Sequence, residues 1–112
     1  MTVVWSSKVD EILKIGQPLT NVGVLNWALT KSQAIKVLDQ FWDSQIAVLG
    51  GDVYENKDGE IKPNYDSWHC DPLDGEAIED FVKRSIEKAK TYVEQYNMSV
   101  PTKTFFVIVP DV

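Results

Sequence analysis

Two uninterrupted apolar runs constrain the fold of this chain more than any other feature. The first, IAVLGGDVYE (46–55), has apolar residues at consecutive positions, and so does the second, TFFVIVP (104–110). A strand that is apolar on both sides must be covered on both faces of its sheet. Each run therefore predicts a buried strand, and the first predicts the central one.

A hairpin is expected directly after the first run. In KDG (57–59), Asp58 tolerates a tight bend and Gly59 takes a positive φ without steric cost. In the returning segment, 60–66, apolar and polar residues alternate, which predicts a half-exposed strand with Tyr65 facing the core. Pro63 cannot donate to a ladder, so this strand should lie at a sheet edge or end early.

Two helices are expected before the first run. Apolar residues between Val9 and Ile15 predict a short amphipathic helix that Gly16 and Pro18 end. Thr30 precedes Gln33 at the spacing of a capping box, which starts a second helix at Lys31. Its buried face is expected to hold Ala34, Ile35, Leu38, Phe41 and Trp42.

A long helix is expected from about Glu76 to Tyr96. Asp80 and Arg84, four residues apart, are expected to form an ion pair on its surface. Its apolar stripe consists of Ile78, Phe81, Val82, Ile86, Ala89, Val93 and Tyr96.

These elements predict an α+β fold, with a small, mostly antiparallel sheet of three or four strands packed with about three helices. Residues 21–29, NVGVLNWAL, fit either a short strand or an ordered loop. A chain of 112 residues has the length of one domain, so we expect a single domain over 1–112.

Composition excludes several classes of function. The single cysteine, Cys70, allows no internal disulfide and no zinc site built of cysteines alone. No apolar run approaches the ~20 residues of a membrane helix, and the N-terminus lacks the pattern of a secretion signal. The net charge of −6 disfavours direct contact with nucleic acid. We therefore expect a cytoplasmic protein without a cofactor, a membrane partner or a nucleic-acid partner.

The negative charge is concentrated in one quarter of the chain. Residues 52–80 contain ten acidic residues and only two basic ones, a charge of −8 against −6 for the whole chain. Such a segment is either a solvated, solubilising face or a focused field that steers a basic protein partner.

The same segment contains the residues best suited to catalysis or to metal binding. The spacing of these residues does not fit most of the known types of site. Gly50 and Gly51 are not followed by the helix that a phosphate loop needs. An EF-hand alignment lacks both its first and its last acidic ligand. His69 and Cys70 are neighbours, so their side chains point apart, which disfavours a metal site or a nucleophile–base pair.

Two readings of the segment stay open. Asp52 and Asp66 lie on strands that are expected to pair, and two close carboxylates are the basis of acid–base catalysis. Alternatively, acids and an aromatic anchor form a protein-binding surface, for which Trp68 is the best exposed aromatic candidate. The candidate partner-binding residues are Asp52, Glu55, Asp58, Glu60, Asp66, Trp68, Asp71, Asp74 and Glu76.

Three blocks in this order resemble the bacterial immunity protein 40 family: AVLGGDVYE (47–55), YDSWHC (65–70) and FVKRSIEKAKTYV (81–93). The resemblance runs from about Trp27 to Val109. It implies a small cytosolic protein without catalytic residues that neutralises a toxin of a polymorphic or contact-dependent toxin system. The acidic segment fits a basic toxin, such as a nuclease.

Three hypotheses follow from the sequence. The first is an immunity protein that binds its cognate toxin through the acidic surface of residues 52–80. The second is a small hydrolase or transferase that uses Asp52 and Asp66. The third is a structural subunit that forms a homodimer, because four tryptophans in so short a chain favour an interface. Both a monomer and a homodimer are compatible with the sequence.

Overall fold

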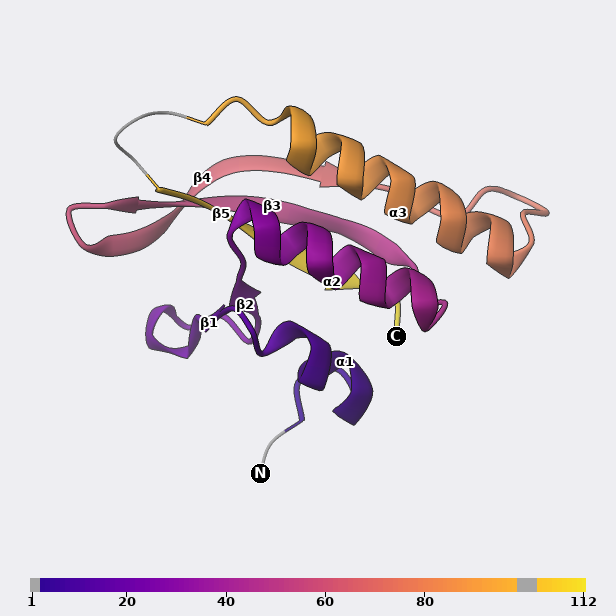
Figure 1. Cartoon of the computed structure of the whole chain (residues 1–112), viewed down its shortest axis with the longest axis horizontal. Coiled ribbons are helices and arrows are strands. Elements are labelled where there is room, and N and C mark those ends of the chain that lie inside the picture. Colours follow the sequence, from indigo (N-terminus) through magenta and orange to yellow (C-terminus); the bar gives the residue numbers. More distant parts are fainter. Residues whose placement is uncertain (1–2, 99–102) are drawn as a thin grey trace.

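A computed structural model describes residues 3–98 and 103–112 (Figure 1). These residues form an α+β fold, as predicted, with three α-helices and two small antiparallel sheets. The elements in chain order are α1 (Ser7–Leu13), β1 (Gln17–Pro18), the 3₁₀ turn η1 (Thr20–Val22), β2 (Trp27–Ala28), α2 (Lys31–Asp43), β3 (Val48–Lys57), β4 (Glu60–His69), α3 (Ile78–Gln95) and β5 (Lys103–Pro110).

The main sheet has the order β4-β3-β5, with both pairs antiparallel. The first apolar run thus forms the central strand and the second forms a buried strand, both as predicted, and the structure places the second beside the first. Asp58 and Gly59 make the turn between β3 and β4, both at positive φ. The predicted hairpin is therefore confirmed, and β4, which contains Pro63, is an edge strand.

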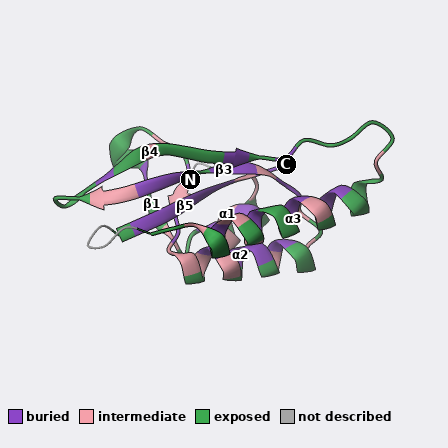
Figure 2. Ribbon diagram, turned by 90° about the horizontal axis from the view of Figure 1, so that it is seen from above, coloured by how far each residue is buried: buried purple, intermediate pink, exposed green. Residues whose placement is uncertain are grey.

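The helices lie on one side of the main sheet (Figure 2). Phe106 and Val53 from the sheet share a core with Phe41 of α2 and Ile86 of α3. The opposite face is covered at the hairpin end by the N-terminal segment, where Leu19 packs in a second cluster with residues of β3, β4 and β5. Because both faces of β3 are covered there, its consecutive apolar residues are explained.

Residues 21–29 are mostly not strand. They contain part of η1 and the two-residue strand β2, and Leu29 adds one bridge to Phe106 at the free side of β5. The Leu29 N–H donates to the Phe106 carbonyl at 2.8 Å, and the reverse bond is 2.7 Å long. At this bridge the chain passes from the face opposite the helices, where Ala28 is buried, to the helix-covered face, where α2 begins.

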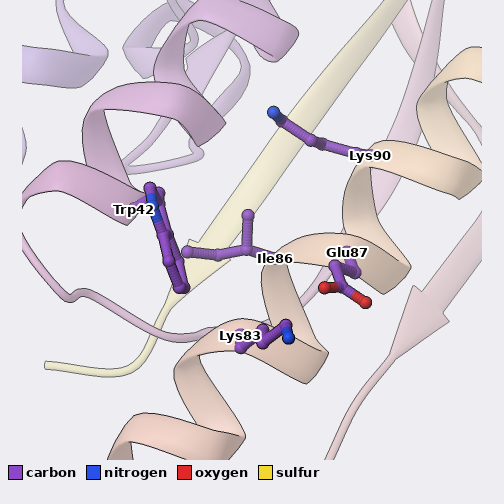
Figure 3. A pocket seen from close by; sticks show the side chains of 5 residues that line it. All are labelled: Trp42, Lys83, Ile86, Glu87 and Lys90. Atoms are coloured by element: carbon purple, nitrogen blue, oxygen red, sulfur yellow. The ribbon is translucent and has the colours of Figure 1, made fainter.

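The capping box of α2 is confirmed. The Thr30 hydroxyl accepts a hydrogen bond from the Gln33 N–H at 3.2 Å, and the Gln33 side chain accepts one from the Thr30 N–H at 2.9 Å. The prediction that Trp42 is buried is wrong, because 43% of its surface is exposed. It lies in the last turn of α2, where the ring reaches the rim of the groove between α2 and α3 (Figure 3).

The long helix α3 begins at Ile78, two residues later than predicted. Ile78 was expected in its apolar stripe, but 80% of its surface is exposed, so that prediction is wrong. The physical reason is position: the first turn of α3 projects past the end of β3 (Figure 1), where the sheet offers no surface to pack against.

Candidate partner-binding surface

The acidic segment runs along the whole long axis of the molecule and does not form one compact patch. The β3–β4 turn lies at one end, and the β4–α3 connection lies at the other (Figure 1). Among the nine predicted site residues, Glu55 and Glu76 are half-buried and Trp68 is buried; the exposed ones are Asp52, Asp58, Glu60, Asp66, Asp71 and Asp74.

At the hairpin end, basic residues offset part of the charge. Lys62 lies 3.0 Å from Glu60, and Lys57 lies 4.0 Å from Glu55. Both lysines are exposed, so these pairs contribute little stability. They nevertheless reduce the negative potential at this end of the molecule.

At the opposite end, one arginine organises the loop between β4 and α3. Arg84 of α3 donates from Nε to Glu76 Oε2 and from Nη2 to Glu76 Oε1, both at 2.8 Å. Nη2 also donates to the Asp71 carbonyl at 2.6 Å, and Nη1 donates to the Cys70 sulfur at 3.1 Å. The predicted pair of Asp80 with Arg84 is not formed, because the guanidinium is fully used by the loop that precedes the helix.

Glu76 closes this loop from its other side. Its Oε1 accepts the Leu73 N–H at 3.0 Å, and its own N–H donates to the Leu73 carbonyl at 3.0 Å. Hydrogen bonds from Arg84 and then from the Leu73 backbone hold the pKa of Glu76 at about 2, against its ordinary value of 4.5. The bidentate pair with Arg84 is the strong form of this interaction.

This shift predicts that part of the stability of the protein is lost in acid. A carboxyl with a lowered folded-state pKa stabilises the fold above pH 4.5, and this contribution disappears as the pH falls toward 2. We expect Glu76→Gln to reduce the fall in unfolding free energy over this range, measured by urea denaturation at successive pH values. Arg84→Ala should reduce it as well, because it removes the hydrogen bonds that lower the pKa. Identical pH profiles for all three proteins would contradict the assignment.

The loop that Arg84 holds displays apolar and acidic side chains together. Leu73 and Ile78 are large, exposed hydrophobic residues on its surface. The exposed acids around them are Asp71, Asp74, Glu79 and Asp80, none of which takes part in an ion pair within the described residues. We call residues 71–80 the acidic loop.

Trp68 is a core residue, so the prediction that it is the exposed aromatic is wrong. Only 6% of its surface is exposed. It pairs with Gly51 across the β3–β4 ladder and stacks on Tyr92 of α3, with ring centroids 4.6 Å apart. A Cβ on Gly51 would lie 2.6 Å from Trp68 Cζ3, so the absence of a side chain at Gly51 makes room for the indole.

The exposed aromatic is Tyr65, which was expected to face the core. In the β3–β4 ladder, Asp52 pairs with Ser67 and Tyr54 with Pro63, so three residues of β4 lie opposite one residue of β3. Asn64, Asp66 and Trp68 face the helices, so Tyr65 lies on the opposite face of the sheet, which the N-terminal segment covers only at the hairpin end. Its side chain is 87% exposed, and its φ of 71° is unusual for a residue with a side chain.

The two carboxylates considered for catalysis are not brought together. Gly51 and Val53 face the helices, so Asp52 between them points to the opposite side of the sheet. Asp66 Oδ2 accepts a hydrogen bond from the Tyr96 hydroxyl, at the end of α3, at 2.5 Å. Two carboxylates on opposite faces of a sheet cannot act on one substrate.

Other site types lack their components in the part of the chain that the structure describes. No group of three or more His, Cys, Asp and Glu side chains is arranged to hold a metal ion in residues 3–98 and 103–112. Cys70 is buried while His69 is exposed, as their adjacency implies. None of the helices in these residues has the length and apolarity to cross a bilayer.

The groove between α2 and α3 is a shallow space of about 210 Å³ (Figure 3). Trp42 and Ile86 face each other across it, and Lys83, Glu87 and Lys90 line its rim. It contains a single carboxylate and no hydroxyl, thiol or imidazole group. Within the described residues, two amines and one carboxylate are therefore the only ionisable groups that line this groove.

Comparison with known proteins agrees with this geometry. The sequence model of the family described as immunity protein 40 matches residues 18–110. The chain belongs to the immunity protein 40 family. The matched range contains α2, α3, the strands β2 to β5 and the last residue of β1, and leaves α1 outside. Neither a curated protein nor a solved structure matches the chain.

Family membership gives this chain the role of an immunity protein in a toxin system, which implies binding to a cognate toxin. The resemblance of the three sequence blocks is thereby confirmed, and the matched range is somewhat longer than they indicated.

Proposed function

We propose that this chain is a cytoplasmic immunity protein that binds and neutralises a basic toxin through the acidic surface of residues 52–80, chiefly at the acidic loop. One observation carries the proposal. Leu73, on the loop that Arg84 holds in place, and Ile78, in the first turn of α3, are exposed beside carboxylates that form no ion pair within the described residues. Exposed apolar residues inside a charged rim are typical of protein-binding surfaces.

The two kinds of side chain contribute differently to binding. Unpaired carboxylates attract a basic protein over a Debye length and so raise the association rate. Burial of Leu73 and Ile78 would instead slow dissociation, because removal of apolar surface from water stabilises the complex. The bonds of Arg84 and Glu76 reduce the conformational entropy that the loop loses on binding.

The proposal predicts a salt-dependent association rate. A toxin and its inhibitor are inherited together when their genes are neighbours. The probe is therefore the polypeptide encoded by the gene next to that of this chain, with a substitution that inactivates it. We expect its association rate constant, measured by stopped-flow fluorescence, to fall roughly tenfold between about 20 mM and about 500 mM salt. Asp71→Asn with Asp74→Asn should weaken this dependence.

The matched control is Asp43→Asn with Glu94→Gln, which removes the same charge from exposed positions on α2 and α3. Its association rate should stay close to that of the unchanged protein. An association rate that does not respond to salt would contradict the electrostatic part of the proposal. Failure of the unchanged protein to bind this polypeptide would contradict the proposal as a whole.

A further inference from the structure

The bulge in β4 holds one aromatic side chain out into solvent. Tyr65 lies between Asn64 and Asp66 in the three residues that have no partner in β3. The two neighbours bind inward, toward α3, and the tyrosine is left 87% exposed. Tyr65 thus lies on the face of the sheet away from the helices, beyond the part that the N-terminal segment covers.

We propose that Tyr65 is the aromatic anchor of the toxin interface, and that it inserts into a pocket of the toxin whose rim carries arginine or lysine side chains. This inference rests on the proposed function and identifies the residue on which affinity depends. It extends the interface from the acidic loop along the edge strand β4 to the middle of that strand.

Packing in the core does not explain why position 65 holds a tyrosine. A φ of 71° brings the Cβ of any side chain against its own backbone, and asparagine or glycine tolerates this better than tyrosine. Because the Tyr65 side chain is exposed, burial of its ring does little to offset the free energy that this strain costs. Backbone strain at an exposed aromatic residue is therefore consistent with selection for contact with a partner.

The bulge is held rigidly by a hydrogen-bond network. Asn64 Nδ2 donates to Glu55 Oε1 at 3.1 Å and to the Tyr96 hydroxyl at 2.8 Å. The Asp66 N–H donates to Asn64 Oδ1 at 2.9 Å, and the Tyr96 hydroxyl donates to Asp66. Burial, and then the hydrogen bond to Asp66, raises the pKa of Tyr96 to about 12, so the hydroxyl keeps its proton at neutral pH.

A carboxylate near the anchor determines the chemistry of its partner. Asp52 is exposed on the face of the sheet away from the helices, where Tyr65 also lies. Asp52 pairs with Ser67, two residues after Tyr65, so the two side chains belong to the same part of the β3–β4 pair. A guanidinium can stack on a tyrosine ring while it binds a carboxylate.

The same charges exclude other occupants. A second copy of this chain would bring acid against acid, and nucleic acid carries the same sign of charge as the surface. Addition of a partner strand is disfavoured too, because the bulge and Pro63 interrupt the free edge of β4. A basic protein held by the side chain of Tyr65 is the occupant that remains.

The test compares variants of the full chain for binding to the inactivated toxin polypeptide encoded beside it, by titration calorimetry. Asparagine accepts the left-handed backbone, so Tyr65→Asn should unfold at the same urea concentration as the unchanged protein or a higher one. We expect this variant to bind roughly thirty-fold more weakly. Tyr65→Phe, which keeps the ring, should stay within about threefold.

Trp42→Ala is the matched control, since it removes a partly exposed aromatic side chain from the helix-covered side of the molecule. It should leave the dissociation constant within about threefold of the original value. If Tyr65→Asn binds as tightly as the unchanged protein, the inference is overturned while the proposed function stands. If the unchanged protein does not bind the toxin, the proposed function fails and this inference fails with it.

Discussion

Gly50→Ala is expected to lower the free energy of unfolding by at least about 3 kcal/mol. Gly50 has a φ of 151°, which residues with a side chain rarely adopt. A Cβ at this position would meet the backbone of β4, less than 3 Å from the Trp68 carbonyl oxygen and 2.9 Å from His69 Cα. Neither atom can move without separating β3 from β4, and β3 is the strand to which the rest of the sheet is bonded.

Equilibrium urea denaturation followed by tryptophan fluorescence measures this effect. The matched control is Gly59→Ala in the hairpin turn, where φ is 84° and no atom lies within 4 Å of the new Cβ. It introduces the backbone strain without the collision, and should cost only about 1–2 kcal/mol. Equal losses in the two variants would show that the contact between Gly50 and β4 contributes nothing.

Trp68→Ala is expected to cost about 3–5 kcal/mol of stability. The indole is buried between Gly51 and Tyr92, and the aromatic contacts continue from Tyr92 to Tyr96 and Phe106. Removal of the ring leaves a cavity between β4 and α3 that the rigid sheet cannot close. It also removes the packing that holds Tyr96 beneath the β4 bulge.

Thermal and urea unfolding measure the loss in Trp68→Ala. Tyr65→Ala is the control, because it removes an exposed aromatic ring three residues earlier in the same strand. Its stability should change by less than about 0.5 kcal/mol. A Trp68→Ala protein that unfolds like the original but no longer binds the toxin would return Trp68 to the surface role first predicted for it.

Local features of the fold could be predicted from the sequence. The Thr30–Gln33 capping box acts between neighbours in the chain, and the turn at Asp58 and Gly59 depends on backbone freedom at two residues. The central position of β3 follows from its consecutive apolar residues. In each case the determining interaction lies within a few residues, or depends on one strongly periodic segment.

The orientation of the aromatic residues could not be predicted in the same way. Tyr65 was expected inside and Trp68 at the surface, but α3 covers the face that holds Trp68, and the face that holds Tyr65 is covered only at the hairpin end. No local signal marks which part of a face is covered, because the covering residues, such as Tyr92 and Leu19, are distant in the sequence. The pairing of Arg84 with Glu76 was missed because an ion pair at four-residue spacing is a helix rule, whereas Glu76 precedes the helix.

The sequence by itself determined the α+β class, the central strand, the hairpin and the concentration of negative charge in residues 52–80. Those properties follow from the periodicity and the composition of the amino-acid sequence. The tertiary structure alone decided which side chains reach solvent. Trp68 is buried because Gly51 leaves space for it, and Tyr65 is exposed because the N-terminal segment covers its face of the sheet only at the hairpin end. The acids separate toward two ends because β4 spans the molecule. Exposure depends on atoms distant in sequence, so only the folded chain determines it.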